Sequence, residues 1–151
     1  MSVINSFRGK YGFLSNFCQT QLEYDGLTYS SSEAAFQAQK CEKPEGKIKY
    51  TLIKNPLRIK QMGRREKLPS WWEEKSCDIM YSILKVKFSN PTLKEKLLST
   101  EDAYLEEGNT WHDNLWGNCY CEKCKEKEGY NYLGKILMQI REELKEGEYN
   151  V

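Results

Sequence analysis

The sequence predicts a mainly α-helical fold: a single compact domain over residues 1–151 that carries a small β-hairpin near its N-terminus. Three observations lead to this prediction. Apolar residues recur at helical spacing in two long segments, 69–88 and 130–145. Three further segments begin with serines or with an Asn-Pro pair, which are typical of a helix N-terminus. No internal repeat, low-complexity tract or Gly/Ser linker divides the 151 residues.

In the N-terminal half, the stretch CQTQLEYDGLTYS places Asp25-Gly26 between two short runs rich in Leu, Tyr and Thr, which is a hairpin signal. The next stretch, SSSEAAFQAQK, begins with serines that can cap a helix. Because Ser30 and Glu33 have the spacing of a capping box, a helix is predicted to start at Ser30. Asn55-Pro56 marks the next helix entrance.

In the C-terminal half, segment 69–88 has a helical apolar period and is predicted to be the long central helix. Asn90-Pro91 marks the start of a shorter helix. Segment 130–145 has an apolar stripe with charges on the opposite face, so it should close the core. The segment 109–124 then becomes a loop between the last two helices.

Composition limits the classes of function. Lys plus Arg is 23 and Asp plus Glu is 22, so the chain lacks the excess of positive charge that coats a polyanion. A phosphate inside a pocket remains compatible with this balance. The N-terminus has no signal-peptide core, and no stretch approaches the roughly 20 apolar residues of a membrane helix. We therefore expect a cytoplasmic protein with reduced cysteines and no membrane partner.

The chain carries no Walker loop, no dinucleotide-binding GxGxxG, no GxSxG elbow and no HExxH. Its one histidine, His112, has no obvious nucleophile to activate. The sequence therefore offers none of these sharp catalytic signatures, and no cofactor is expected.

Glu33 has two interpretations. It serves the helix end as a capping-box glutamate, or its burial beside Phe36 raises its pKa and suits it to general acid catalysis. Lys40 lies two helical turns further on, on roughly the same side as Glu33, and is otherwise a solvated lysine. The sequence alone leaves both pairs of alternatives open.

Two further groups also have alternative roles. Arg64 and Arg65 follow a glycine at the end of a short helix, where arginines usually face solvent, but an inward guanidinium would suit a phosphate. Trp71 and Trp72 form either a stacking platform for a base or part of the core.

The stretch NTWHDNLWGNCYCEKC, residues 109–124, holds His112 and a C-x-C-x-x-C run. Three cysteines and one histidine would suffice numerically for tetrahedral zinc. The seven-residue separation of His112 from Cys119, with a tryptophan between them, is not a familiar knuckle. A reduced, partly exposed loop is the simpler interpretation, and metal binding by Cys119, Cys121 and Cys124 stays open.

Taken in order, several stretches resemble one family. They are FRGKYGFLSNF, YDGLTYSSSEAAFQAQK, MGRRE, WW, MYSILKVKFSN, LLST, LEEGNTWHDNLWG and GYNYLGKILMQIRE. This pattern resembles the NADAR family (named for NAD and ADP-ribose), also called YbiA-like, over about residues 7–142. The resemblance implies a mainly helical, YbiA-like fold.

The resemblance also implies an activity, the hydrolysis of N-glycosidic bonds to ribose. Its main implication is removal of ADP-ribose from ADP-ribosylated guanine in nucleic acid, a reversal of ADP-ribosylation that would have a cognate ADP-ribosyltransferase. The alternative is cleavage of early ribosylamino-pyrimidine phosphate intermediates of riboflavin biosynthesis. A non-catalytic module that binds ADP-ribose is the third possibility.

Carried onto this chain, the family motifs imply a set of site residues. Those implied for catalysis are Glu33, Lys40, Lys87 and Asp113. Those implied for substrate binding are Phe13, Leu14, Ser15, Asn16, Phe36, Gly63, Arg64, Trp72, Trp116, Gly117, Asn131 and Gly134. Many relatives have a histidine directly after the glutamate, whereas this chain has Ala34, so no role of that histidine applies here.

Departure of a base from ribose builds positive charge at C1′ and negative charge on the leaving nitrogen, so a carboxylate and an acid are both useful. Glu33 and Asp113 would divide these roles. Alternatively, a lysine amine attacks C1′ and holds the opened sugar as a Schiff base, which requires a lowered pKa. The sequence does not choose between Lys40 and Lys87 for this step.

Overall fold

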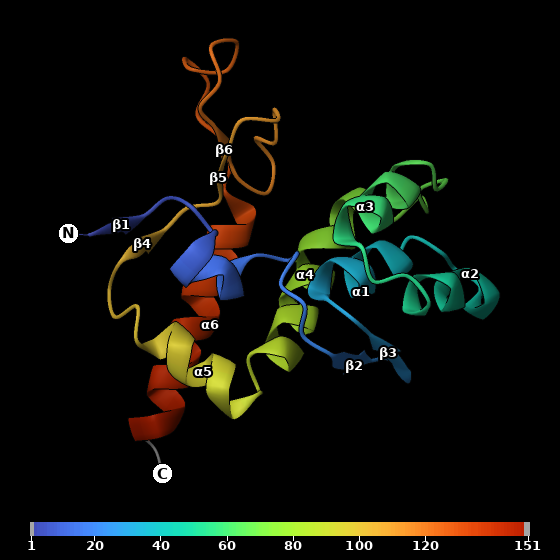
Figure 1. Ribbon diagram of the computed structural model, residues 1–151, viewed down its shortest axis with the longest axis horizontal. Helices are drawn as coiled ribbons and strands as arrows, with labels where there is room; N and C mark the ends of the chain where they lie inside the picture. Colours follow the sequence, from blue (N-terminus) through green and yellow to red (C-terminus); the bar gives the residue numbers. More distant parts are fainter. Residues whose placement is uncertain (1, 150–151) are drawn as a thin grey trace. The chain divides into compact units, whose positions relative to one another are not determined.

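Helices are the main regular structure of both compact units into which the chain folds, which confirms the mainly helical prediction (Figure 1). The computed structural model describes residues 2–149. One unit comprises the N-terminal residues up to Ser15 together with the chain from Pro91 onward, and the other comprises Asn16–Asn90. Each unit is described separately below, and a single domain over residues 1–151 stays a prediction.

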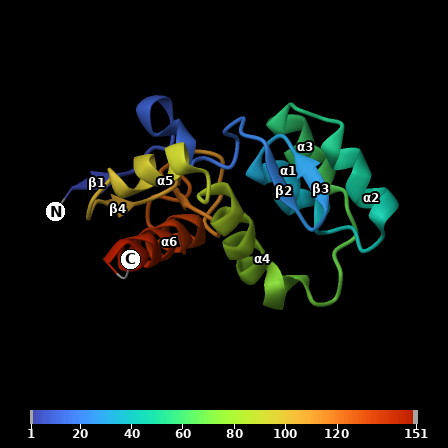
Figure 2. The ribbon, with the colours of Figure 1, turned by 90° about the horizontal axis from the view of Figure 1, so that it is seen from below.

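The unit Asn16–Asn90 begins with the predicted hairpin. Strands β2 (Leu22–Tyr24) and β3 (Leu27–Tyr29) pair antiparallel, with Leu22 opposite Tyr29 (Figure 2). Asp25 and Gly26 at the turn have φ of 50° and 83°. Two consecutive left-handed residues are what a two-residue hairpin turn requires, and aspartate followed by glycine supplies them at low cost.

The N-cap of helix α1 (Ser32–Ala38) lies one residue later than predicted. Ser31 is its N-cap, and the Ser31 hydroxyl accepts a hydrogen bond from the Ala34 backbone N–H at 3.1 Å. The predicted capping box of Ser30 and Glu33 is therefore wrong. The Ser30 hydroxyl instead donates to the Ile53 carbonyl at 3.4 Å, so the Glu33 carboxylate is not part of a capping box with Ser30.

The remaining helices of this unit surround α1. They are α2 (Pro44–Ile48), the 3-10 turn η2 (Lys49–Thr51), α3 (Pro56–Arg64) and α4 (Trp72–Lys87). As predicted, Asn55 caps α3, and its Oδ1 accepts from the Leu57 and Arg58 backbone N–H groups. Helix α1 packs against α3 and α4, and every residue of α1 is buried. The side chains of α1 are therefore held by the core of this unit.

The other unit is built on two helices, α5 (Pro91–Leu98) and α6 (Tyr132–Tyr149), with the 3-10 helix η1 (Gly9–Leu14). Strand β1 (Val3–Ile4) pairs in parallel with β4 (Tyr104–Leu105), and β5 (Gly108–Asn109) pairs in parallel with β6 (Asn118–Cys119). The apolar stripe of α6 is buried at Leu133, Ile136, Leu137 and Ile140. As predicted, the segment before α6 is mostly loop, although it carries two short strands that the sequence did not reveal (Figure 1).

Within residues 2–149, none of the helices combines the length and the apolar character needed to cross a lipid bilayer.

Candidate functional site

Glu33 is a buried carboxylate near the start of α1, with 7% of its surface exposed. Its Oε1 accepts a hydrogen bond of 2.9 Å from Nε2 of Gln37, one helical turn further on. The Glu33 backbone N–H donates to the carbonyl of Asn16 at 3.0 Å, and Asn16 Oδ1 accepts from the Ser32 hydroxyl. The backbone and the carboxylate of Glu33 are thus both fixed.

Gln37 was not identified in the sequence, although its i+4 spacing from Glu33 could have revealed it. Its amide lies against Gly63 of α3. A Cβ atom at residue 63 would lie 1.9 Å from Gln37 Oε1 and 2.9 Å from Gln37 Cγ. Gly63 therefore provides the space that lets Gln37 reach Glu33.

Lys40 lies just after α1, beside the same glycine. Its Nζ donates to the Gly63 carbonyl at 3.2 Å and lies 5.7 Å from the centre of the Trp72 ring. Burial lowers the pKa of Lys40, while the charge of Glu33 acts in the opposite direction and Arg64 adds to the lowering. The rings of Trp72 and Phe36, 5.1 Å apart, form an apolar wall beside these charges.

The structure therefore connects several predicted residues through Glu33, Gly63 and Lys40: Asn16, Glu33, Phe36, Lys40, Gly63, Arg64 and Trp72. We call this set the Glu33 cluster. Arg64 at the end of α3 is exposed, so its guanidinium faces solvent rather than inward. Trp72 is only 8% exposed, which favours the core interpretation over an open stacking platform.

Lys87, the second predicted lysine, lies near the end of α4 and is only 2% exposed. Burial lowers the pKa of its ammonium to about 8, with the charge of Cys18 acting in the opposite direction. Its Nζ lies 5.2 Å from the centre of the Phe88 ring. A buried amine of this kind is partly neutral just above neutral pH.

In the other unit, Asp113 organises a turn. Its Oδ1 accepts from the backbone N–H groups of Leu115 and Trp116, at 3.1 and 2.9 Å. Asn109 fixes the same turn, because its Oδ1 accepts from the Asp113 N–H and its Nδ2 donates to the Asp113 carbonyl. The half-buried Asp113 carboxylate therefore shapes the loop that it belongs to.

Gly117, Asn131 and Gly134 allow close approach of backbones in this unit. Asn131 Oδ1 accepts from the Glu107 N–H, and its Nδ2 donates to the Leu105 carbonyl at 2.9 Å. A Cβ atom at Gly134 would lie 2.1 Å from that same carbonyl, and one at Gly117 would lie 2.1 Å from the Glu107 carbonyl. Packing therefore accounts for the glycines and the asparagine at these three positions. Substrate binding by the three residues stays a prediction.

The first of the residues predicted to bind substrate lie in and just after η1. Phe13 and Leu14 are buried, Leu14 completely, and the Nζ of Lys96 lies 5.9 Å from the centre of the Phe13 ring. Ser15 is half-buried, and its N–H donates to the Gly12 carbonyl at 3.0 Å. Trp116 is half-buried and meets Tyr132 edge to face at 6.2 Å.

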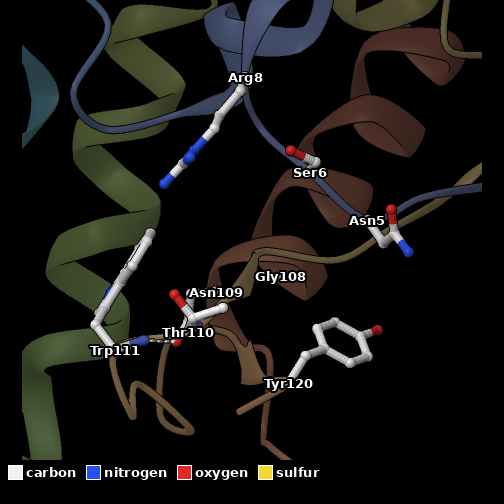
Figure 3. A pocket seen from close by; sticks show the side chains of 8 residues that line it. All are labelled: Asn5, Ser6, Arg8, Gly108, Asn109, Thr110, Trp111 and Tyr120. Atoms are coloured by element: carbon white, nitrogen blue, oxygen red, sulfur yellow. Dashed lines mark hydrogen bonds between the residues drawn. The ribbon is translucent and has the colours of Figure 1, made fainter.

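An open hollow of about 320 Å³ lies between the N-terminal segment and the residues around β5 and β6 (Figure 3). Its lining residues are Asn5, Ser6, Arg8, Gly108, Asn109, Thr110, Trp111 and Tyr120. The Arg8 guanidinium lies 5.7 Å from the centre of the exposed Trp111 ring. This cation–aromatic pair was missed in the sequence, and its chemistry suits the face of a base.

The loop 109–124 also gathers the four possible metal ligands. The ligand atoms of His112, Cys119, Cys121 and Cys124 all lie within 4.8 Å of one another. The loop is partly exposed, as expected, but Cys119 and Cys124 within it are buried, whereas His112 is exposed and Cys121 is half-buried.

Comparison with known proteins places these features in a family. The model of the NADAR domain matches residues 5–145. N-glycosidase YbiA of Escherichia coli (strain K12) is 34% identical over 148 residues, which cover 95% of this chain and 89% of that protein. The NMR structure of the E. coli protein YbiA superimposes with a TM-score of 0.83 and 32% identity, over 99% of this chain and 89% of that one.

Two larger proteins are also similar. The riboflavin biosynthesis protein PYRR, chloroplastic, of Zea mays is 34% identical over 152 residues, 89% of this chain. The riboflavin biosynthesis protein VVA0006 of Vibrio vulnificus (strain YJ016) is 31% identical over 141 residues, 90% of this chain. The chain spans only 23% of the maize protein and 36% of the Vibrio protein.

Proposed function

Since the chain belongs to the NADAR family and is an N-glycosidase, a hydrolase of N-glycosyl bonds, we propose that it releases ADP-ribose from ADP-ribosylated guanine in nucleic acid. The single observation that carries the proposed mechanism is the buried Glu33 carboxylate, held by Gln37 and facing the charge of Lys40.

The chemistry of the bond explains why this arrangement is useful. When the base departs, positive charge builds at C1′ of the ribose, and a fixed carboxylate stabilises that charge or activates the attacking water. The Gln37 hydrogen bond holds one oxygen of Glu33, so little reorganisation is needed during the reaction. Phe36 and Trp72 keep this environment apolar, which strengthens the electrostatic effect.

The cations of the Glu33 cluster support a substrate that carries phosphate. Lys40 lies between the apolar wall and Gly63, and exposed Arg64 ends the helix that follows. A guanidinium offers the fork geometry that phosphate oxygens prefer. We propose that Arg64, although its guanidinium faces solvent, binds a phosphate at the protein surface and that Lys40 contacts the sugar-phosphate portion.

Asp113 is proposed as the second carboxylate, which donates a proton to the leaving base. Only Oδ1 is needed for the turn with Leu115 and Trp116, so the same side chain can shape the loop and meet a ligand through its other oxygen.

The alternative Schiff-base route needs a neutral amine that can reach C1′. Burial lowers the pKa of Lys87 to about 8, but only 2% of its surface is exposed. Lys40 is half-buried, and the charge of Glu33 opposes the lowering of its pKa by burial. We therefore favour Lys40 for any contact with substrate. Borohydride trapping of a sugar on Lys87 but not on Lys40 would reverse this choice.

A second candidate substrate is the ribosylamino-pyrimidine phosphate of early riboflavin biosynthesis. The observation that favours it is the similarity to the maize and Vibrio proteins, whose names place them in that pathway. This substrate also joins ribose to a ring-borne nitrogen and carries a phosphate, so the same cluster could serve it.

A parallel chromatographic assay separates the candidates. Purified protein is offered a guanine-ADP-ribosylated oligonucleotide and, separately, the ribosylamino-pyrimidine phosphate. Release of ADP-ribose from the oligonucleotide is expected. Ribose phosphate released only from the pyrimidine would assign the chain to the second substrate. Tight binding of ADP-ribose without cleavage of either compound would indicate a binding module and refute the proposal.

A further inference from the structure

The cysteine-rich part of the loop 109–124 lacks the apolar side chains that would normally hold it in place. In segment 121–128, with the sequence CEKCKEKE, every residue other than the two cysteines is Glu or Lys and is exposed. Cys124 is nevertheless buried, with 4% of its surface exposed. Hydrophobic burial cannot fix so polar a segment, so another interaction must hold it.

Backbone geometry brings the four ligands together. Parallel pairing of β5 with β6 sets Asn109 opposite Cys119, and His112 follows Asn109 by one turn of the loop. The C-x-x-C pair is closed by a hydrogen bond of 3.1 Å from the Cys124 N–H to the Cys121 carbonyl. Residues far apart in the segment therefore converge at one point.

Two distances between ligand atoms match the edges of a tetrahedral metal site. The Nδ1 atom of His112 lies 3.3 Å from Cys121 Sγ and 3.5 Å from Cys124 Sγ. With Zn–S near 2.3 Å and Zn–N near 2.0 Å, the N···S edge of a tetrahedron is about 3.5 Å and the S···S edge about 3.8 Å. The widest spacing of 4.8 Å would need to contract by about 1 Å when an ion binds, which small side-chain rotations permit.

The surroundings also suit a thiolate. Cys119 Sγ accepts from the backbone N–H groups of His112 and Cys121, at 3.3 and 3.5 Å. Such outer hydrogen bonds orient metal-bound sulfur and stabilise its charge. His112 has φ of 69°, a left-handed conformation that non-glycine residues adopt uncommonly. All six cysteines, which lie within residues 2–149, are free thiols and so are present as possible metal ligands.

We propose that His112 Nδ1 and the Sγ atoms of Cys119, Cys121 and Cys124 bind one Zn²⁺ ion that fixes the loop 109–124. Three thiolates and one imidazole fill a tetrahedron and leave no open position, which is the signature of a structural rather than a catalytic zinc. Up to three thiol protons are released on binding. The loop carries Asp113 and Trp116, so the ion would hold these residues in place without contacting substrate.

The proposal does not depend on the proposed substrate, because its test measures metal. Full-length protein purified without chelator from zinc-supplemented medium should contain about one equivalent of zinc, as a four-ligand site holds one ion. Replacing the metal with Co²⁺ should give the visible absorption bands of a tetrahedral, thiolate-bound ion. Addition of a strong chelator should lower the unfolding temperature.

Variants locate the site. Cys119→Ser and Cys124→Ser should lose most of the zinc, whereas Cys18→Ser and Cys77→Ser in the other unit should keep it. If Cys119→Ser and Cys124→Ser do not fold, the Co²⁺ spectrum of the unaltered chain decides whether the thiolates bind a metal ion. Protein without zinc and without the cobalt bands would overturn the proposal. Full retention of zinc by Cys119→Ser and Cys124→Ser, or iron in place of zinc in the unaltered protein, would also overturn it.

Discussion

Nε2 of Gln37 donates to Oε1 of Glu33 at 2.9 Å, between two side chains that are both nearly inaccessible to solvent. Hydrogen bonds to charged groups are worth about 1.5–3 kcal/mol, which corresponds to roughly 10–100-fold in rate. Gln37→Met preserves volume but removes the donor, so we expect kcat to fall by roughly that factor with little change in KM. Steady-state kinetics on the N-riboside substrate measures both.

The matched control for this variant is Gln39→Met on the same stretch of chain. Gln39 is equally buried but donates to the Ala35 carbonyl rather than to Glu33. It should affect stability without a specific loss of kcat. Equal kinetic losses in the two variants would show that Gln37 acts only through packing.

Gly63→Ala tests the space that Gln37 occupies. The new Cβ would lie 1.9 Å from Gln37 Oε1, so the amide must move and its bond to Glu33 must break. We expect overpacking to cost about 1–3 kcal/mol and kcat to fall as in Gln37→Met. Gly147→Ala is the control, because a Cβ there meets nothing within 4 Å and alanine favours helix. Urea denaturation that shows equal stability for both variants would contradict the steric argument.

Asp113 can be separated into its two roles by two substitutions. Asparagine keeps an oxygen that accepts from the Leu115 and Trp116 N–H groups, whereas alanine does not. If Asp113 is the acid, Asp113→Asn should lower kcat by about 10²–10⁴ while the unfolding temperature is retained. Asp113→Ala should lower both. Full activity of the asparagine variant would leave Asp113 only its structural role.

Lys87 should make the stability of the protein depend on pH. Its pKa is about 8 when folded, against an ordinary value of 10.5, so the unfolded chain binds more protons between these values. The free energy of unfolding therefore rises with pH from about 8 toward 10.5 and is lowest below pH 8, by roughly 3 kcal/mol at most.

The variant Lys87→Met lacks the titrating amine and should therefore lack this pH dependence. Urea denaturation at pH 7 and pH 9.5 should show a wild-type rise that the variant lacks. Burial raises the pKa values of Tyr29 and Tyr50, but these groups act at higher pH and are present in both proteins, so the difference between the two proteins reports Lys87. If the free energy of unfolding changed with pH in the same way in both proteins, burial of the Lys87 ammonium would not destabilise the folded state.

Local chemistry made most helices predictable. Asn55-Pro56 and Asn90-Pro91 each combine a polar residue with a proline whose missing N–H is harmless in the first turn, and both helices begin as predicted. The start of α1 was missed by one residue because Ser30 and Ser31 both fit a cap locally. Tertiary contact decided, since the Ser30 hydroxyl is used by Ile53.

The candidate site was less predictable because its contacts span elements. Glu33 and Lys40 lie on one short stretch and could be paired by helical spacing, whereas the fit of Gln37 against Gly63 depends on how α1 and α3 pack. The convergence of His112 with the cysteines depends on the β5–β6 pairing, which is only two residues long and has no recognisable pattern. Contacts between distant elements of this kind cannot be predicted from the spacing of residues in the sequence.

The most direct test of the central claim compares wild-type protein with Glu33→Gln on a guanine-ADP-ribosylated oligonucleotide. Chromatography measures released ADP-ribose, and circular dichroism checks that both proteins are folded. The amide keeps the size of the side chain but removes its charge, so the wild type should release ADP-ribose and Glu33→Gln should release almost none. Full release by Glu33→Gln would contradict the role given to this carboxylate, and no release by folded wild-type protein would contradict the proposed substrate.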